Sequence, residues 1–177
     1  MKNNKGFSLI EVIIAISIMA IVAGIGSLSF SAARKQDVVK TAKVVDSIMT
    51  QVRMDNMSKA KAEYMYIYID PEKDDYCYKL SNTKVNSVSA IRSLSDTQEV
   101  ICSDTIVIAA GTESSTNVIG QNDYLTISFE KSTGAFKCYS SWTGTSEATI
   151  EVMTFKRNRK TSTITMASET GKHSVTE

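Results

Sequence analysis

The sequence predicts an α+β protein in which one long N-terminal helix packs on an antiparallel β-sheet domain. An apolar run begins at Phe7, is interrupted by one charge at Glu11, and then continues uncharged to Ala33. The following thirty or so residues place apolar side chains at steps of three and four, the period of a helix with one buried face. From Tyr64 onward the pattern changes to alternation, which indicates strands.

The apolar run is long enough to cross a membrane. Between Glu11 and Arg34 lie about 22 uncharged residues, and about 20 helical residues span a bilayer core. A secretory signal peptide would have a shorter apolar core and a small-residue cleavage site. A plain membrane anchor explains the length but not Glu11, since a carboxylate at membrane depth costs a few kcal/mol and needs a partner.

The run leads into an amphipathic segment without a helix breaker, because no proline occurs before Pro71. One helix is therefore expected from about Phe7 to about Ala62, roughly 80 Å long at 1.5 Å per residue. Gly24 and Gly26 leave two interpretations open, a kinked or melted segment or close contact with another helix. The expected buried stripe consists of Val38, Ala42, Val45, Ile48 or Met49, and Val52.

The first expected strand, Tyr64–Ile69, alternates aromatic and aliphatic residues. Its aliphatic residues are expected to face the helix, and its tyrosines the other side of the sheet. A tyrosine face could pack against neighbouring strands or recognise a ligand.

A turn at Asp70–Asp75 should end this strand, because Asp and Pro favour turns. Its carboxylates suggest calcium, but an EF-hand loop needs glycine at its sixth position and glutamate at its twelfth. This chain has Asp75 and Ser81 there, so a solvated hairpin turn is favoured.

Further strands and hairpins are expected along the rest of the chain. The segment 111–123 is rich in Gly, Ser, Thr and Asn and predicts an exposed loop. Two alternating stretches each reach a Thr-Gly turn, at Gly134 and Gly171, as hairpins do. The remaining strand candidates are 76–80, 85–91, 99–102, 105–109 and 148–156.

Composition argues against several function classes. The formal charge is +1, from 20 basic and 19 acidic residues, so net charge does not support nucleic-acid binding. The local exception is the basic segment with Lys156, Arg157, Arg159 and Lys160. No phosphate-cradling loop or GxSxG nucleophile motif occurs, and we expect neither an enzyme nor a cofactor.

The three cysteines, Cys77, Cys102 and Cys138, are not spaced as a metal knuckle, and the one histidine, His173, is near the C-terminus. A metal site is therefore not expected. In an exported domain one disulfide could form among them, and spacing does not identify the pair. The alternative is three small buried side chains.

The stretch Lys5-Gly6-Phe7-Ser8-Leu9-Ile10-Glu11-Val12, followed by the apolar run, resembles the N-terminal signature of type IV pilins and type II secretion pseudopilins. The resemblance implies that a prepilin peptidase cuts after Gly6 and that the new N-terminal Phe7 is N-methylated. It also implies that Glu11 neutralises the terminal amine of a neighbouring subunit. The closing strand, Thr-Gly turn and strand resemble the C-terminal hairpin of minor pseudopilins and FimT-like pilins.

This resemblance implies a pilin-like fold divided into a leader peptide (1–6), a membrane and filament-core half-helix (7–33), an amphipathic half-helix (34–63) and a β-sheet domain (64–177). The expected function is that of a structural subunit, a minor pilin or pseudopilin, of a type IV pilus, type II secretion or competence filament. The expected partners are other pilin or pseudopilin subunits, prepilin peptidase, the membrane and, indirectly, an assembly ATPase and platform protein.

Before assembly the protein would cross the membrane once with its globular domain outside the cytoplasm, and afterwards it would lie in a cell-surface or periplasmic filament. A second hypothesis is a membrane-anchored binding module, such as a DNA-uptake or adhesive pilin tip. Trp142, in a predicted turn, and the basic residues Lys156, Arg157, Arg159 and Lys160 would carry that function, although the net charge disfavours DNA.

Overall fold

The computed structural model describes residues 9–144 and 146–176, and the side chains of residues 23–35 are outside this description. Two compact units are present, Met1–Gln36 and Asp37–Glu177. Helix α1 (Leu9–Ser58) contributes to both units and is followed by antiparallel sheets, which confirms the α+β class. It is helical at Gly24 and Gly26, so the chain is not melted there.

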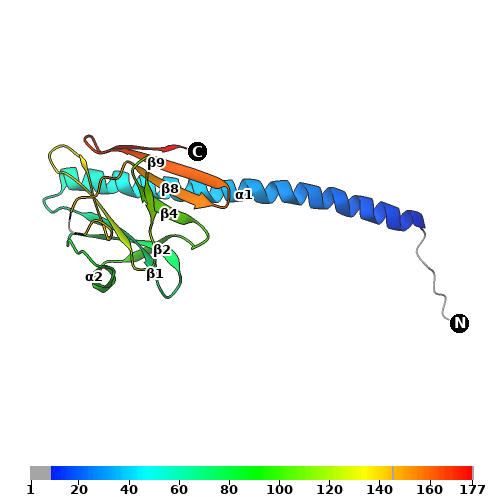
Figure 1. Ribbon diagram of the computed structural model, residues 1–177, viewed down its shortest axis with the longest axis horizontal. Coiled ribbons are helices and arrows are strands. Elements are labelled where there is room, and N and C mark those ends of the chain that lie inside the picture. The colour runs from blue at the N-terminus through cyan, green and yellow to red at the C-terminus, as the bar shows by residue number, and fades with distance from the viewer. Residues whose placement is uncertain (1–8, 145, 177) are drawn as a thin grey trace. The chain divides into compact units, whose positions relative to one another are not determined.

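The globular unit, Asp37–Glu177, contains two five-stranded antiparallel sheets (Figure 1). Sheet A has the strand order β3-β2-β1-β6-β7, and sheet B has the order β10-β9-β8-β4-β5. The strands are β1 (Tyr64–Asp70), β2 (Asp75–Ser81), β3 (Gln98–Cys102), β4 (Val107–Gly111), β5 (Thr116–Val118), β6 (Tyr124–Phe129), β7 (Phe136–Ser140), β8 (Val152–Arg157), β9 (Lys160–Ala167) and β10 (Lys172–Thr176).

The main core lies where both sheets pack on one face of α1. The predicted stripe is buried here, and Met49 and Val52 have no exposed surface. From β1, Met65, Ile67 and Ile69 join the same core, as expected. The helical period therefore identified the correct face of the helix, and the alternation identified the correct face of β1.

Helix α1 ends at Ser58, four residues before the predicted end. The buried side chain of Asn56 explains the early turn of the chain. Its amide nitrogen donates to the carbonyl oxygen of Glu63 at 2.9 Å, and its oxygen accepts from the backbone N–H of Glu63. The same amide group donates to the hydroxyl of Ser128 at 3.1 Å, so one side chain joins the helix, the connector and β6.

The opposite face of sheet A is also covered, which the sequence did not predict. Segment 85–91, expected to be a strand, leads into the short helix α2 (Val88–Ser93), where Ser87 caps the N-terminus by accepting from the N–H of Ala90. Ile91 of α2 packs in a second cluster with Tyr66 and Tyr68 of β1. Both tyrosines are fully buried, so the tyrosine face packs internally and is not an exposed recognition surface.

The predicted turns are present. β1 and β2 pair across the Asp70–Asp75 turn, and the two Thr-Gly turns join β6 to β7 and β9 to β10. Gly134 and Gly171 adopt positive φ angles of 69° and 63°. The expected loop at 111–123 differs in one respect, because it contains the short, exposed edge strand β5.

Candidate assembly site

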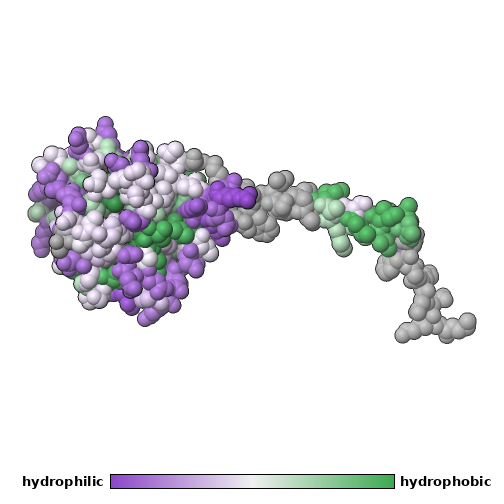
Figure 2. Space-filling view, viewed as in Figure 1, coloured by the Kyte–Doolittle hydropathy of each residue, from purple (hydrophilic) through white to green (hydrophobic). Residues whose placement is uncertain are grey.

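The first part of α1 exposes apolar side chains on all its sides. Figure 2 shows this segment as hydrophobic. Such a helix is stable when lipid or other helices surround it. Within the described residues, no helix combines the length and the apolarity needed to cross a membrane. The exposed fractions range from 46% to 78% for Leu9, Ile10, Val12, Ile13, Ile14, Ile16, Ile18, Met19, Ile21 and Val22.

Glu11 lies in the first turn of α1, where the positive end of the helix dipole favours an acidic side chain. Ala15 and Met19 follow it at steps of four along the helix, so the carboxylate shares a face with apolar side chains. A carboxylate in such surroundings is stabilised by a cationic partner. Gly6 and Phe7 lie outside the described residues.

The basic segment, Lys156–Lys160, forms the tight turn between β8 and β9, with Asn158 at a φ of 56°. Arg157 is ion-paired with Asp37 of α1, with 2.6 Å between Nη1 and Oδ2. Lys156 and Arg159 are exposed, and Lys160 is half-buried.

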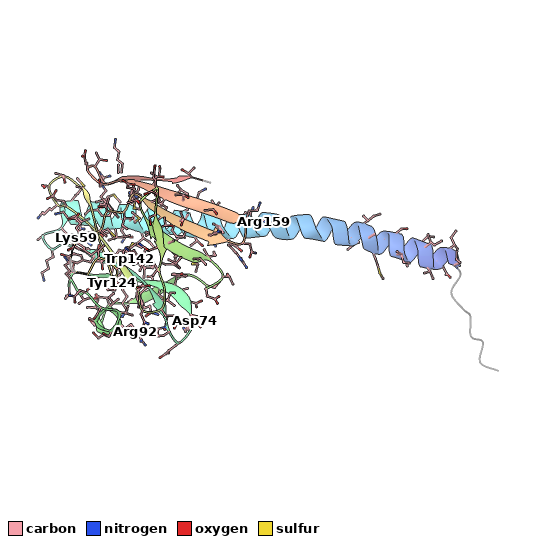
Figure 3. All side chains as sticks on the ribbon, viewed as in Figure 1. Lys59, Asp74, Arg92, Tyr124, Trp142 and Arg159 are labelled. Atoms are coloured by element: carbon pink, nitrogen blue, oxygen red, sulfur yellow. The ribbon has the colours of Figure 1, made fainter. Side chains whose placement is uncertain are left out.

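Trp142 does not join the basic segment. It is half-buried in the turn after β7 and packs against the main core. Figure 3 shows Trp142 and Arg159 on different parts of the globular unit. With Tyr66 and Tyr68 buried as well, the features of the predicted binding module do not converge on one surface.

The three cysteines are free, buried thiols that the sheets keep apart. Cys102 lies on edge strand β3 and Cys138 on the opposite edge strand, β7. Cys138 is at least three strand spacings, about 14 Å, from Cys77 on β2. A disulfide requires Cα atoms about 4.4–6.8 Å apart. Cys77 faces the second cluster and Cys102 the main core, so those two thiols also point to different faces of sheet A.

Burial raises the pKa of the Cys102 thiol to about 12 and raises the pKa values of Cys77 and Cys138. The three side chains therefore behave as small buried hydrophobes with little thiolate. Among the described residues, no cluster of three or more His, Cys, Asp or Glu side chains could hold a metal ion.

Two residues that position these surfaces were missed by sequence reasoning. Asp37 holds the basic segment on α1 through its ion pair with Arg157. Arg53 donates to the carbonyl oxygens of Gly134, at 3.3 Å, and Thr170, at 2.8 Å. All three contacts join residues more than eighty positions apart, so no local pattern could reveal the partners.

Comparison with known proteins gives one match, which covers the N-terminal segment. The family model described as the prokaryotic N-terminal methylation motif matches residues 1–27. No curated protein and no solved structure matches the chain. The motif points to a structural, non-enzymatic subunit, made as a membrane-anchored precursor, processed by prepilin peptidase and assembled with other pilin subunits. This chain carries the prepilin signature of type IV pilins and pseudopilins.

Proposed function

We propose that this protein is a structural subunit, a minor pilin or pseudopilin, of a type IV pilus, type II secretion or competence filament. The observation that carries the proposal is the match to the methylation motif, in which Gly6-Phe7 precedes Glu11 and a helix that is apolar on all its sides.

Processing divides the chain as follows in this proposal. Prepilin peptidase removes the leader, residues 1–6, by cutting after Gly6, and Phe7 becomes the N-methylated N-terminus. Residues 7–33 anchor the precursor and later form the filament core. Residues 34–63 are the amphipathic part of the helix with its connector, and residues 64–177 are the sheet domain outside the cytoplasm.

Assembly transfers the apolar helix from lipid to a bundle of neighbouring helices. Lipid tails and helix side chains are similarly apolar, so this transfer has little hydrophobic driving force of its own. The pairing of Glu11 with the Phe7 amine of an adjacent subunit supplies the specificity, because a buried carboxylate requires a cation. An assembly ATPase, acting through a platform protein, supplies the energy, since the sequence has no P-loop.

The processing step is tested with Gly6→Val, expressed together with a prepilin peptidase and an N-methyltransferase activity. Mass spectrometry should then find the leader Met1–Gly6 retained. Gly144→Ala, a change in an open surface turn, should be processed as the wild type is. Normal cleavage of Gly6→Val would contradict the proposal.

The assembly step is tested with Glu11→Ala and the isosteric Glu11→Gln. Both should insert into membranes as the wild type does and should be depleted from the sheared filament fraction. Ser17→Ala, which changes a hydroxyl that is bonded within the same helix, is the matched control. Incorporation of Glu11→Gln at the wild-type level would show that the negative charge is not used.

A further inference from the structure

The basic turn, Lys156–Lys160, has a charge excess that the proposed assembly mechanism does not use. It contains four basic residues within five positions, and Lys40 of α1 lines the same groove as Arg157. Among the described residues, two carboxylates belong to the segments that line this groove. Asp37 is paired with Arg157, and Asp104 belongs to the β3–β4 connection, whose residues Ser103 and Thr105 line the groove. Positive charge therefore predominates on this surface.

The position of the basic turn is fixed by its ion pair to α1. Arg157 is bonded to Asp37, the first residue of the globular unit. Asp37 follows Arg34 by three residues, about 4.5 Å along a helix, and Arg34 ends the uncharged segment. Figure 3 shows Arg159 and Lys59 at opposite ends of the globular unit.

We propose that the basic turn and Lys40 bind the anionic phospholipid headgroups of the membrane in which the precursor is anchored. This inference rests on the proposed function, because it requires residues 7–33 to span that membrane. The headgroup layer is several ångströms thick on each side of the hydrocarbon core, so a residue about one helical turn beyond Arg34 lies within or beside it. Attraction of Lys and Arg to an anionic surface acts within the Debye length, about 8 Å at physiological ionic strength.

A nucleic acid would present similar phosphate chemistry, but the structure favours lipid. The basic turn is ion-paired with Asp37, which follows Arg34 by three residues in the sequence. Trp142, the sole tryptophan of the sequence, packs elsewhere and offers the basic turn no stacking platform. The headgroup contact would hold the globular unit against the membrane until extraction into the filament breaks it.

The test places the full-length, isotope-labelled chain in phospholipid nanodiscs with nitroxide-labelled headgroups. Broadening of backbone amide signals then reports which residues lie near the headgroups. In discs containing phosphatidylglycerol, amides 156–160 should broaden at least about threefold more than in discs of phosphatidylcholine alone. High salt should remove the difference, because it screens exposed charges.

The triple variant Lys156→Gln, Arg159→Gln, Lys160→Gln should lose this extra broadening. A matched control neutralises three exposed lysines on other turns and strands, Lys73, Lys131 and Lys172, and should keep it. Equal broadening in the two disc types, or an unchanged signal in the first triple variant, would overturn the inference. A different result would also overturn it: the wild-type chain shows no headgroup contact in the discs but binds a DNA duplex in a salt-sensitive way, and the triple variant does not bind the duplex.

The two proposals fail in distinguishable ways. A chain that does not insert into the discs overturns both the anchored precursor and the headgroup contact. A chain that inserts and is cleaved after Gly6, but shows no charge-dependent broadening, overturns the headgroup contact alone.

Discussion

Gly171 lies directly against the carbonyl oxygen of Gly134, so that a Cβ atom added at position 171 would be 1.9 Å from that oxygen. The two Thr-Gly turns, which belong to different sheets, therefore touch through their backbones. Arg53 of α1 donates to the carbonyl oxygens of both turns, at Gly134 and Thr170. Close by, the N–H of Phe136 donates to the carbonyl oxygen of Ser168 at 2.8 Å. These contacts join sheet A, sheet B and the helix at one point.

The first prediction concerns this contact. Gly171→Ala should destabilise the fold by about 3 kcal/mol or more, because alanine disfavours the positive φ of this position and its methyl group also forces a shift of the Gly134 backbone. Gly144→Ala is the matched control, since Gly144 has a similar φ of +64° with no atom within 4 Å of the added Cβ. It should cost about 1 kcal/mol. Urea unfolding followed by Trp142 fluorescence measures the free energy of unfolding of both variants. Equal losses of stability would refute the close contact between Gly171 and Gly134.

A second prediction concerns Asn56, which is 2% exposed and binds both backbone groups of Glu63. Asn56→Asp keeps the shape but removes two N–H donors and places a carboxylate against a carbonyl oxygen. We expect a loss of about 2–4 kcal/mol in the free energy of unfolding. Asn117→Asp makes the same chemical change on the exposed strand β5 and should cost less than about 0.5 kcal/mol. Similar losses in both variants would contradict the role given to Asn56.

Local patterns predicted the fold wherever one element carries its own signal. The three- and four-residue steps from Val38 to Val52 identified the buried face of α1, and the Thr-Gly pairs identified two hairpins. The error at segment 85–91 was also local. Val85, Val88 and Ile91 recur at steps of three on both sides of the cap residue Ser87, which is a helical pattern rather than a strand.

Long-range features were outside the reach of sequence patterns. The division into two sheets depends on the chain passing from β3 of sheet A to β4 of sheet B and back to β6. No residue marks these crossings. The residues proposed for processing and assembly, Gly6, Phe7 and Glu11, differ because they lie within one short stretch of the sequence. The pair Asp37–Arg157, separated by 120 positions, had to be seen in the fold.

A third prediction concerns the thiols. Because Cys77, Cys102 and Cys138 are buried and free, the folded chain should react slowly with a thiol reagent such as Ellman's reagent. After unfolding in the absence of reductant, all three should react. If a disulfide forms in the exported protein, one thiol per chain will react until reductant is added. That result would contradict the separation of the cysteines in the sheets.

The last prediction concerns the alkaline stability of the buried tyrosine face. Burial raises the pKa values of Tyr66 and Tyr68 to about 12, whereas an unfolded tyrosine ionises near pH 10. Between pH 10 and 12 the unfolded chain therefore releases protons that the folded chain retains. The stabilisation is fully present below pH 10 and is lost as the pH rises towards 12, by at most about 1.4 kcal/mol per pH unit for each tyrosine.

Tyr66→Phe separates this effect from ordinary loss of stability. The variant loses the bonds of the hydroxyl to the carbonyl oxygen of Thr83 and to the N–H of Val85, so it should be about 1–2 kcal/mol less stable at neutral pH. Above pH 10 its stability should nevertheless fall less steeply than that of the wild type, because the variant lacks the Tyr66 hydroxyl, whose pKa is raised in the folded chain. Unfolding free energies measured from pH 8 to pH 12 test this slope. Parallel curves for the two proteins would show that Tyr66 ionises alike in the folded and unfolded chains.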